Sequence, residues 1–235
     1  MPNAGKTEIH LWKQALPISE DQVKSAATIA QATLTPDEQQ RMSRIGKSSL
    51  LEAHGWMTSR LFLRSVLAQY MQVQARDIQF KYGTSGKPYV QGGPRFSLSH
   101  TKGLCVLAVT SSIAELGVDV EWMRPLLRQQ AIIERFLTIA EQGYISNGMR
   151  KGRERSRLLW EMLTRKEAWV KASGQALCGQ WRTLNTVDDH SAKMNLVERE
   201  GRSYMLRKLD VGRGYVGALC MEGKVQASIR WMSCI

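Results

Sequence analysis

The spacing of apolar residues changes at about residue 78, and this change limits the chain to folds that combine helices with sheets. Before it, apolar residues recur at helical spacing within residues 47–71, which predicts one long helix. After it, short apolar segments alternate with glycine-containing turns, in residues 77–82, 94–99, 103–110 and 113–122. The sequence therefore predicts a helical region followed by a block of strands.

The same order recurs loosely in the second half of the chain. A long helix is predicted over about 154–173, and β-rich stretches at 194–199, 203–209, 214–221 and 225–232 predict a closing sheet. At the start of the chain, residues 8–16 are typical of a strand, and Ser19 stands where it would cap the next helix. No sequence repeat proves that the two halves arose by duplication.

Local sequence signals place several boundaries and faces. The segment Thr35-Pro36-Asp37-Glu38 combines a capping box with proline at the first helical position, and Thr138 and Glu141 form a second capping box. Arg60 and Arg64 are four residues apart and should share one helix face. The basic stretch 147–157 is interpreted as a solvated loop in preference to a nucleic-acid-binding arm.

Composition narrows the class of protein without naming a substrate. The 235 residues are 43% hydrophobic and 23% charged, which is typical of a folded globular chain. The net charge of +12 favours polyanions, phosphorylated small molecules or an acidic protein surface as partners. Dispersed cysteines, no signal peptide and no apolar run long enough to cross a bilayer predict a cytoplasmic protein without a membrane association.

Two carboxylates stand two residues apart in Gly117-Val118-Asp119-Val120-Glu121. On a strand, Asp119 and Glu121 project from the same face, and two neighbouring anions are unfavourable unless a cation joins them. An oxygen-ligated ion such as Mg²⁺ would suit the pair. Taken alone, the pattern more often indicates a solvated strand face that nearby lysines neutralise.

Three further fragments carry groups that could contact a phosphate. Glu167 and Lys171 share a helix face, which by itself could be a surface ion pair. Ser99 and His100 lie at a predicted strand end, where a loop could present them. The turn Gly83–Pro88 contains Lys87 but lacks the spacing of a nucleotide-binding P-loop.

The order of these fragments is more specific than any one of them. G-K-P, F-S-L-S-H-T, G-V-D-V-E and R-K-E-A-W-V-K follow one another between Arg60 and Gly174, and this series resembles the Sfp-type 4′-phosphopantetheinyl transferase family. The resemblance implies an α/β (α+β) fold of two similar halves, residues 1–121 and 122–235, in a pseudo-dimeric monomer with the active site in the cleft between them. It also implies transfer of the phosphopantetheine arm from coenzyme A to a serine of an apo acyl or peptidyl carrier protein with an acidic surface, with adenosine 3′,5′-bisphosphate released.

The resemblance also implies roles for individual residues. It assigns Asp119, Glu121 and Glu167 to Mg²⁺ or Mn²⁺ and Lys171 to the reacting pyrophosphate, with Glu167 the best candidate for the base. The contacts with coenzyme A that it implies are Arg60, Arg64, Lys87, Pro88, Ser99, His100 and Lys171.

Two positions depart from the family pattern, and two other functions compete with it. Leu163 stands where tryptophan is common, with Trp160 one turn earlier, and Ser97 stands where asparagine is frequent. A basic nucleic-acid-binding protein would explain the charge without needing Asp119 or Glu167, but no nucleic-acid motif is present. An inactive relative that only binds coenzyme A or a carrier would not need to keep the acidic residues.

Overall fold

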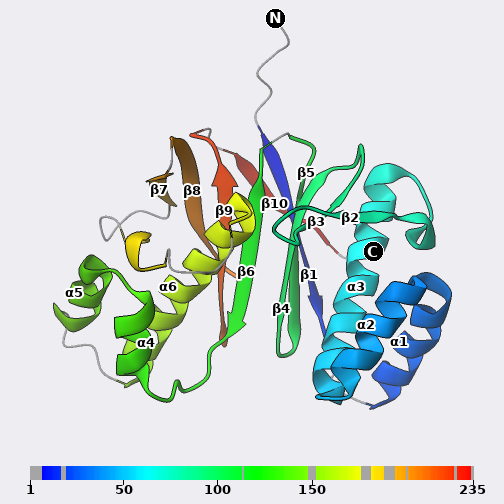
Figure 1. The fold of residues 1–235 in the computed structure, drawn as a ribbon, viewed down its shortest axis with the longest axis horizontal. Helices are drawn as coiled ribbons and strands as arrows, with labels where there is room; N and C mark the ends of the chain where they lie inside the picture. The colour runs from blue at the N-terminus through cyan, green and yellow to red at the C-terminus, as the bar shows by residue number, and fades with distance from the viewer. Residues whose placement is uncertain are drawn as a thin grey trace, which may run out of the picture.

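A computed structural model describes residues 7–16, 20–112, 114–147, 152–175, 181–187, 194–199, 201–224 and 227–233, and it has an α+β fold built on two four-stranded sheets (Figure 1). The strands of these sheets are β1 (Glu8–Ala15), β4 (Arg95–Thr101), β5 (Leu104–Thr110), β6 (Leu116–Trp122), β7 (Met194–Arg199), β8 (Arg202–Leu209), β9 (Tyr215–Glu222) and β10 (Ser228–Trp231). A small hairpin pairs β2 (Phe80–Tyr82) with β3 (Pro88–Val90). The α-helices are α1 (Glu20–Thr33), α2 (Pro36–Gly46), α3 (Leu50–Met71), α4 (Gln129–Phe136), α5 (Ile139–Asn147) and α6 (Gly152–Ser173).

Each sheet contains one strand from the other half of the chain. The first has the order β10-β1-β5-β4 and the second has the order β6-β9-β8-β7. The last strand, β10, pairs in parallel with β1, so the prediction that residues 225–232 join the closing sheet is wrong. Likewise β6, which precedes most of the second half, pairs with β9. The boundary predicted at residues 121 and 122 therefore does not separate the two sheets.

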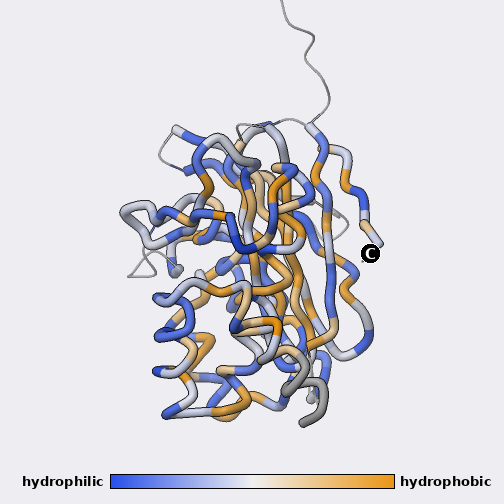
Figure 2. Tube along the Cα trace, turned by 90° about the vertical axis from the view of Figure 1, so that its right-hand side faces the viewer, coloured by the Kyte–Doolittle hydropathy of each residue, from blue (hydrophilic) through white to orange (hydrophobic). Residues whose placement is uncertain are grey.

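The core is layered, with a helix on the outer face of each sheet. The two sheets pack face to face through apolar residues that include Leu11, Val106, Val118 and Leu219. The long helix α3 covers the other face of the first sheet, and α6 covers the other face of the second. Figure 2 shows the apolar segments gathered in the middle of the molecule and polar segments along the outer helices. This arrangement brings β4 and β6, which are the edge strands of their sheets, side by side.

Local signals in the sequence account for most helix boundaries. Both bonds of the Thr35/Glu38 capping box are present at the start of α2, and Thr138 and Glu141 bond to each other's backbone in the same way at α5. Ser49 caps α3, which begins at Leu50. The predicted cap Ser19 lies outside the described residues.

Three features differ from the expectations. Helix α6 begins at Gly152, so the end of the basic stretch 147–157 is helical and not a loop. Strand β4 continues through Thr101, which places His100 within the strand. Helix α4 has no strong start signal in the sequence, because its N-cap Arg128 makes no side-chain capping bond.

Within the described residues, no helix is both long enough and apolar enough to cross a membrane. Cys105 and Cys220 are buried on β5 and β9 and form no disulfide, and Cys178 and Cys234 lie outside the described residues.

Candidate functional site

A cavity of about 380 Å³ lies between helix α3 and the end of helix α6. One wall comes from α2, α3 and the turn 83–88, the floor comes from β4, and the opposite wall comes from the end of α6. Both halves of the chain therefore contribute to the cavity. A second pocket opens beside it, over the ends of β4, β6 and α6, and its lining is Leu98, Ser99, His100, Asp119, Glu121, Glu167 and Lys171.

The structure brings together the three acids that the sequence singled out. Alternate residues of β6 face opposite sides, so Val118 and Val120 enter the core between the sheets while Asp119 and Glu121 face α6. Glu167 and Lys171 reach the same pocket from one face of α6. Sequence positions nearly 50 residues apart thus converge because α6 packs directly on β6.

Close approach of α6 to β6 depends on Gly117. A Cβ atom at this position would lie 2.1 Å from the carbonyl oxygen of Ala168 and 2.5 Å from the amide nitrogen of Ala172. Both atoms belong to the helix backbone and cannot move without moving α6. Gly117 therefore allows β6, which carries Asp119 and Glu121, to approach α6, which carries Glu167.

Asp119 is buried and has only one of its two oxygens paired. Its Oδ1 accepts hydrogen bonds from Lys171 Nζ at 2.8 Å and from Ser99 Oγ at 2.8 Å. Its Oδ2 is buried and has no hydrogen-bond partner among the described residues. A buried carboxylate oxygen without a partner is unfavourable, so this atom marks a position where a cation or a donor would be bound.

The two glutamates beside Asp119 are shifted toward their neutral forms. Burial, followed by the charge of Asp119, raises the pKa of Glu167 to about 7. The same two causes, in the same order, raise the pKa of Glu121. Both shifts show that negative charge is crowded here and only partly balanced by Lys171.

The donor set fits a hard divalent cation. It consists of carboxylate oxygens, one of them an orphaned buried atom, and such oxygens are the ligands that Mg²⁺ prefers. Among the described residues no three acidic, histidine or cysteine side chains already stand close enough together to hold a metal, so the assignment of Asp119, Glu121 and Glu167 to a metal ion stays a prediction. Lys171 bonds to Asp119 and supplies positive charge at this place.

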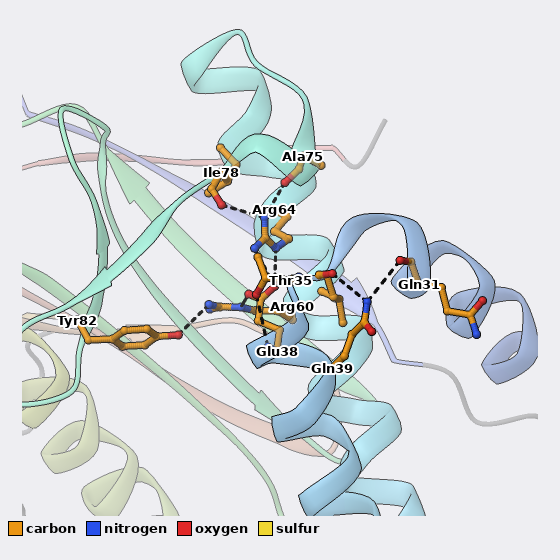
Figure 3. Close-up of polar contacts among 10 residues, drawn as sticks. Gln31, Thr35, Glu38, Gln39, Arg60, Arg64, Ala75, Ile78 and Tyr82 are labelled. Atoms are coloured by element: carbon orange, nitrogen blue, oxygen red, sulfur yellow. Dashed lines mark hydrogen bonds and ion pairs between the residues drawn. The ribbon is translucent and has the colours of Figure 1, made fainter.

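Arg64 is held among Glu38, Ala75 and Ile78 (Figure 3), and it is not among the residues that line the cavity. Its side chain is 1% exposed, and its guanidinium donates to Glu38 Oε2 and to the carbonyl oxygens of Ala75 and Ile78. Burial alone would raise the pKa of Glu38, but the bonds from Arg64 and the charge of Arg60 outweigh it and lower that pKa. Four hydrogen bonds thus commit Arg64 to the packing of this region, and nothing here supports its predicted contact with a coenzyme A phosphate, which stays a prediction.

Arg60 borders the cavity, and its side chain is held in a fixed orientation by its neighbours. Its guanidinium is bonded to Glu38 and donates to the hydroxyl of Tyr82 at 3.1 Å. It also stacks on the ring of Phe80, with 3.8 Å between Cζ and the ring centroid. The arginine is 7% exposed, so it offers the cavity a preset positive charge and not a mobile one.

The turn 83–88 forms part of the cavity wall. Lys87 Nζ bonds to Glu115 Oε2 at 2.7 Å and to the carbonyl oxygen of Leu116 at 2.9 Å. These bonds attach the turn, and with it Pro88, to the beginning of β6. Lys87 and Pro88 both line the cavity, where the expected contact with coenzyme A remains a prediction.

Ser99 and His100 diverge, as neighbours on a strand must. His100 faces the cavity, and burial, followed by the charge of Lys171, lowers its pKa, which favours the neutral ring. The Ser99 hydroxyl points to Asp119, which as a carboxylate can only accept, so the serine donates its hydrogen there. A phosphate would have to compete for that hydrogen, and the predicted phosphate contact of Ser99 stays a prediction.

Arg41 is a candidate that the sequence reasoning missed. It is exposed on α2, it lines the cavity, and it lies over the Trp56 ring with 5.7 Å from Cζ to the centroid. Among the described residues no carboxylate lies within ion-pair distance of it. Its position three residues after Glu38, one turn along the capped helix, was the available signal.

A buried network holds the α6 segment that carries Glu167. The Lys166 ammonium bonds to Glu141 Oε2 at 2.8 Å and to the carbonyl oxygens of Trp181 and Leu184, and neither charged side chain is exposed. Thus α6 is attached to the capping box of α5. One turn before Leu163, the indole of Trp160 donates to the Arg124 carbonyl at 3.0 Å, which ties α6 to the segment after β6.

Comparison with known proteins gives consistent matches over most of the chain. A family model described as the 4′-phosphopantetheinyl transferase superfamily matches residues 115–220, and a model described as the N-terminal part of 4′-phosphopantetheinyl transferase matches residues 21–112. The 4′-phosphopantetheinyl transferase HetI of Nostoc sp. is 29% identical over 175 residues, covering 72% of this chain and 70% of that protein. The 4′-phosphopantetheinyl transferase Sfp of Bacillus subtilis is 23% identical over 192 residues, covering 80% of this chain and 81% of Sfp.

Proposed function

The chain belongs to the 4′-phosphopantetheinyl transferase superfamily, and on that basis we propose that it transfers phosphopantetheine from coenzyme A to a serine of an apo carrier protein. The observation that carries the proposal is the pocket that unites Asp119, Glu121, Glu167 and Lys171 beside a cation-lined cavity. The cavity would hold the nucleotide end of coenzyme A, and the acidic pocket would hold the reacting pyrophosphate.

The cavity presents the charges that the phosphates of coenzyme A require. Arg41 is exposed and free of carboxylates among the described residues, and Arg60 is fixed by Glu38. Both suit an anionic phosphate, for which arginine offers several donors in a fixed geometry. Lys87, Pro88 and His100 border the same space and would contact the nucleotide.

Asp119, Glu121 and Glu167 would hold Mg²⁺, or Mn²⁺ in its place. When bound, the ion supplies positive charge against the pyrophosphate oxygens. Lys171 Nζ bonds to Asp119 Oδ1 at 2.8 Å. Its positive charge, fixed at this place, would also stabilise the negative charge of the leaving phosphate.

The proton of the attacking serine needs an acceptor in this pocket. Without a metal, burial and the charge of Asp119 raise the pKa of Glu167 to about 7, and a bound cation would lower it. Glu167 is therefore one candidate for the base, and a water molecule in the pocket is the other. In the reaction, the serine oxygen forms a bond to the phosphorus of the phosphopantetheine arm as the pyrophosphate bond breaks. Adenosine 3′,5′-bisphosphate leaves, and the serine proton passes to Glu167 or to a water molecule in the pocket.

The carrier protein would approach from the open side of the pocket. A net charge of +12 favours an acidic partner surface and speeds its association. One chain supplies both walls of the cavity, which supports a monomer as the active form. The dispersed cysteines support a reducing compartment such as the cytoplasm.

Intact-mass measurement of carrier proteins tests the proposal. The chain is incubated with coenzyme A, Mg²⁺ and apo acyl and peptidyl carriers side by side, and we expect at least one carrier to gain the mass of one phosphopantetheine arm. Asp119→Ala and Glu167→Ala should abolish the gain while the proteins remain folded. The matched control is Glu161→Ala on the same helix, whose carboxylate bonds to Arg157 and Lys208 outside the pocket. No mass gain with any carrier, or full activity of either pocket variant, would contradict the proposal.

A further inference from the structure

The two sheets meet at β4 and β6 without backbone pairing between these strands. Each strand is the edge of its own sheet, so one row of its backbone groups has no strand partner. In β6 the amides of Val118, Val120 and Trp122 point to this edge. Buried amides must find acceptors elsewhere, and here they find side chains.

Three hydroxyls on one face of β4 accept these amides in a regular series. Ser97 Oγ accepts from Val118 at 3.0 Å, Ser99 Oγ accepts from Val120 at 3.3 Å, and Thr101 Oγ1 accepts from Trp122 at 3.2 Å. The residues advance by two on both strands, so the strands run parallel and stay in register. We call this series the hydroxyl ladder, defined by Ser97, Ser99 and Thr101.

The hydroxyls of Ser99 and Thr101 also bond to the acids of the site. Ser99 Oγ lies 2.8 Å from Asp119 Oδ1, and Thr101 Oγ1 lies 3.1 Å from Glu121 Oε2. Because an amide can only donate and a carboxylate only accepts, each hydroxyl accepts from the backbone of β6 and donates to an acid on β6. Each carboxylate is thereby tied to the backbone one residue after its own.

The first rung of the ladder, Ser97, has no acid to hold. Asp119 directly precedes Val120, the partner of Ser99, and Gly117 likewise directly precedes Val118, the partner of Ser97. Gly117 has no side chain that could bond to Ser97, and α6 packs closely against it. Ser97 therefore bonds to β6 without bonding to an acid, and it also lines the cavity. The chain itself thus offers a rung that joins the strands without touching the acidic pocket's carboxylates.

We propose that Ser99 and Thr101 are positioning residues that aim the carboxylates of Asp119 and Glu121, and that the hydroxyl ladder holds β6 in register against β4. Hydrogen bonds to metal-binding carboxylates fix their orientation, as partners of metal ligands generally do. The positioning of the acids rests on the proposed metal site. The joint between the strands does not depend on it.

Four variants and two measurements test the ladder. Ser97→Ala, Ser99→Ala and Thr101→Val each remove one hydroxyl, and Thr101→Ser restores a hydroxyl at the third rung. Thr110→Val is the matched control, because Thr110 is a buried hydroxyl on β5 that bonds to the Glu8 carbonyl and not to β6. Amide hydrogen exchange is measured by NMR without metal, and Mn²⁺ binding is measured by EPR in the presence of coenzyme A.

We expect each deletion to speed exchange at its own amide. Val118 should exchange about fivefold faster or more in Ser97→Ala, Val120 in Ser99→Ala and Trp122 in Thr101→Val, the factor that corresponds to one typical hydrogen bond. Thr101→Ser and Thr110→Val should leave all three amides protected. Unchanged exchange rates at these amides would show that the hydroxyl ladder does not join β4 to β6.

We expect Mn²⁺ affinity to follow the acids. Ser99→Ala and Thr101→Val should weaken it about 10-fold, whereas Ser97→Ala, Thr101→Ser and Thr110→Val should stay within about twofold. Unchanged affinity in both Ser99→Ala and Thr101→Val would overturn the positioning role. If the unmodified chain bound no Mn²⁺, the proposed metal site and the positioning role of Ser99 and Thr101 would both be wrong. The amide exchange would still show whether the hydroxyl ladder joins β4 to β6.

Discussion

At the scale of single residues, Glu167 is both the most useful acid of the site and a cost to the fold. Its pKa is raised from 4.5 to about 7, so the folded chain holds a proton on it that the unfolded chain releases. Its contribution to stability is complete below pH 4.5 and is lost as the pH rises through 7. The shift corresponds to about 3 kcal/mol, which solvent screening at this partly exposed side chain reduces to about 1–2 kcal/mol.

We therefore predict that Glu167→Gln stabilises the metal-free chain at pH 8 by about 1–2 kcal/mol, because the amide cannot carry the unfavourable charge. At pH 4 the two proteins should be nearly equally stable, because Glu167 is then mostly protonated in both the folded and the unfolded chain. Urea unfolding in the presence of a chelator measures both values. A stabilisation of equal size at the two pH values would contradict the assignment of the effect to charge.

Two arginines of the N-terminal half should respond in opposite ways to removal. Arg64→Ala leaves Glu38 buried without its main partner and should destabilise the fold by about 3–5 kcal/mol. Arg41→Ala removes an exposed side chain and should change stability by less than about 0.5 kcal/mol, while raising the KM for coenzyme A. Urea unfolding and steady-state kinetics separate the two effects. A large loss of stability in Arg41→Ala would show that this residue is structural as well.

At the scale of elements, the contact between β6 and α6 positions the acids. Gly117→Ala would place a methyl group 2.1 Å from the Ala168 carbonyl, so α6 must move away from β6. We predict a destabilisation of about 1–3 kcal/mol, as for other overpacked cores, together with a loss of transfer. Glu167 and Lys171 would leave their places opposite Asp119.

The control for this prediction is Gly143→Ala in α5, where an added Cβ meets nothing within 4 Å. Alanine is the better helix former, so this change should stabilise the chain by up to about 1 kcal/mol and leave transfer intact. Urea unfolding and the carrier mass assay are run on both variants. Wild-type transfer by Gly117→Ala would show that the site tolerates a shift of α6.

At the scale of the whole molecule, the exchange of strands binds the two halves into one unit. The first sheet contains β10 from the end of the chain, and the second contains β6 from its middle. Neither half can therefore complete its sheet alone. The shared core between the sheets and the hydroxyl ladder add further contacts across the joint.

We predict a single cooperative unfolding transition for this reason. Near-ultraviolet circular dichroism and amide exchange at Leu11 in the first sheet and Leu219 in the second should give the same midpoint in urea. Separate midpoints for the two sheets would show that the halves unfold independently. A two-step transition that became one step with coenzyme A bound would also contradict the prediction.

The sequence predicted the elements, the fold class and the chemical class of the site. Helix boundaries at Thr35 and Thr138 followed from capping boxes, and the strands followed from apolar spacing, because both depend on residues a few positions apart. The order of the motifs identified the family, which the comparisons confirmed. The same motifs named Asp119, Glu121, Glu167 and Lys171, which the structure gathers in one pocket.

Only the tertiary structure decided which strands pair, which charges are free and what holds the acids. Arg60 and Arg64 look alike on their helix, yet one borders the cavity and the other is buried against Glu38. The partner of β10, the place of Arg41 over the Trp56 ring at the cavity and the hydroxyl ladder also could not be predicted from local sequence. The physical reason is the same in each case: burial and hydrogen-bond partners depend on groups that are distant in sequence, and only the packed chain determines which of them meet.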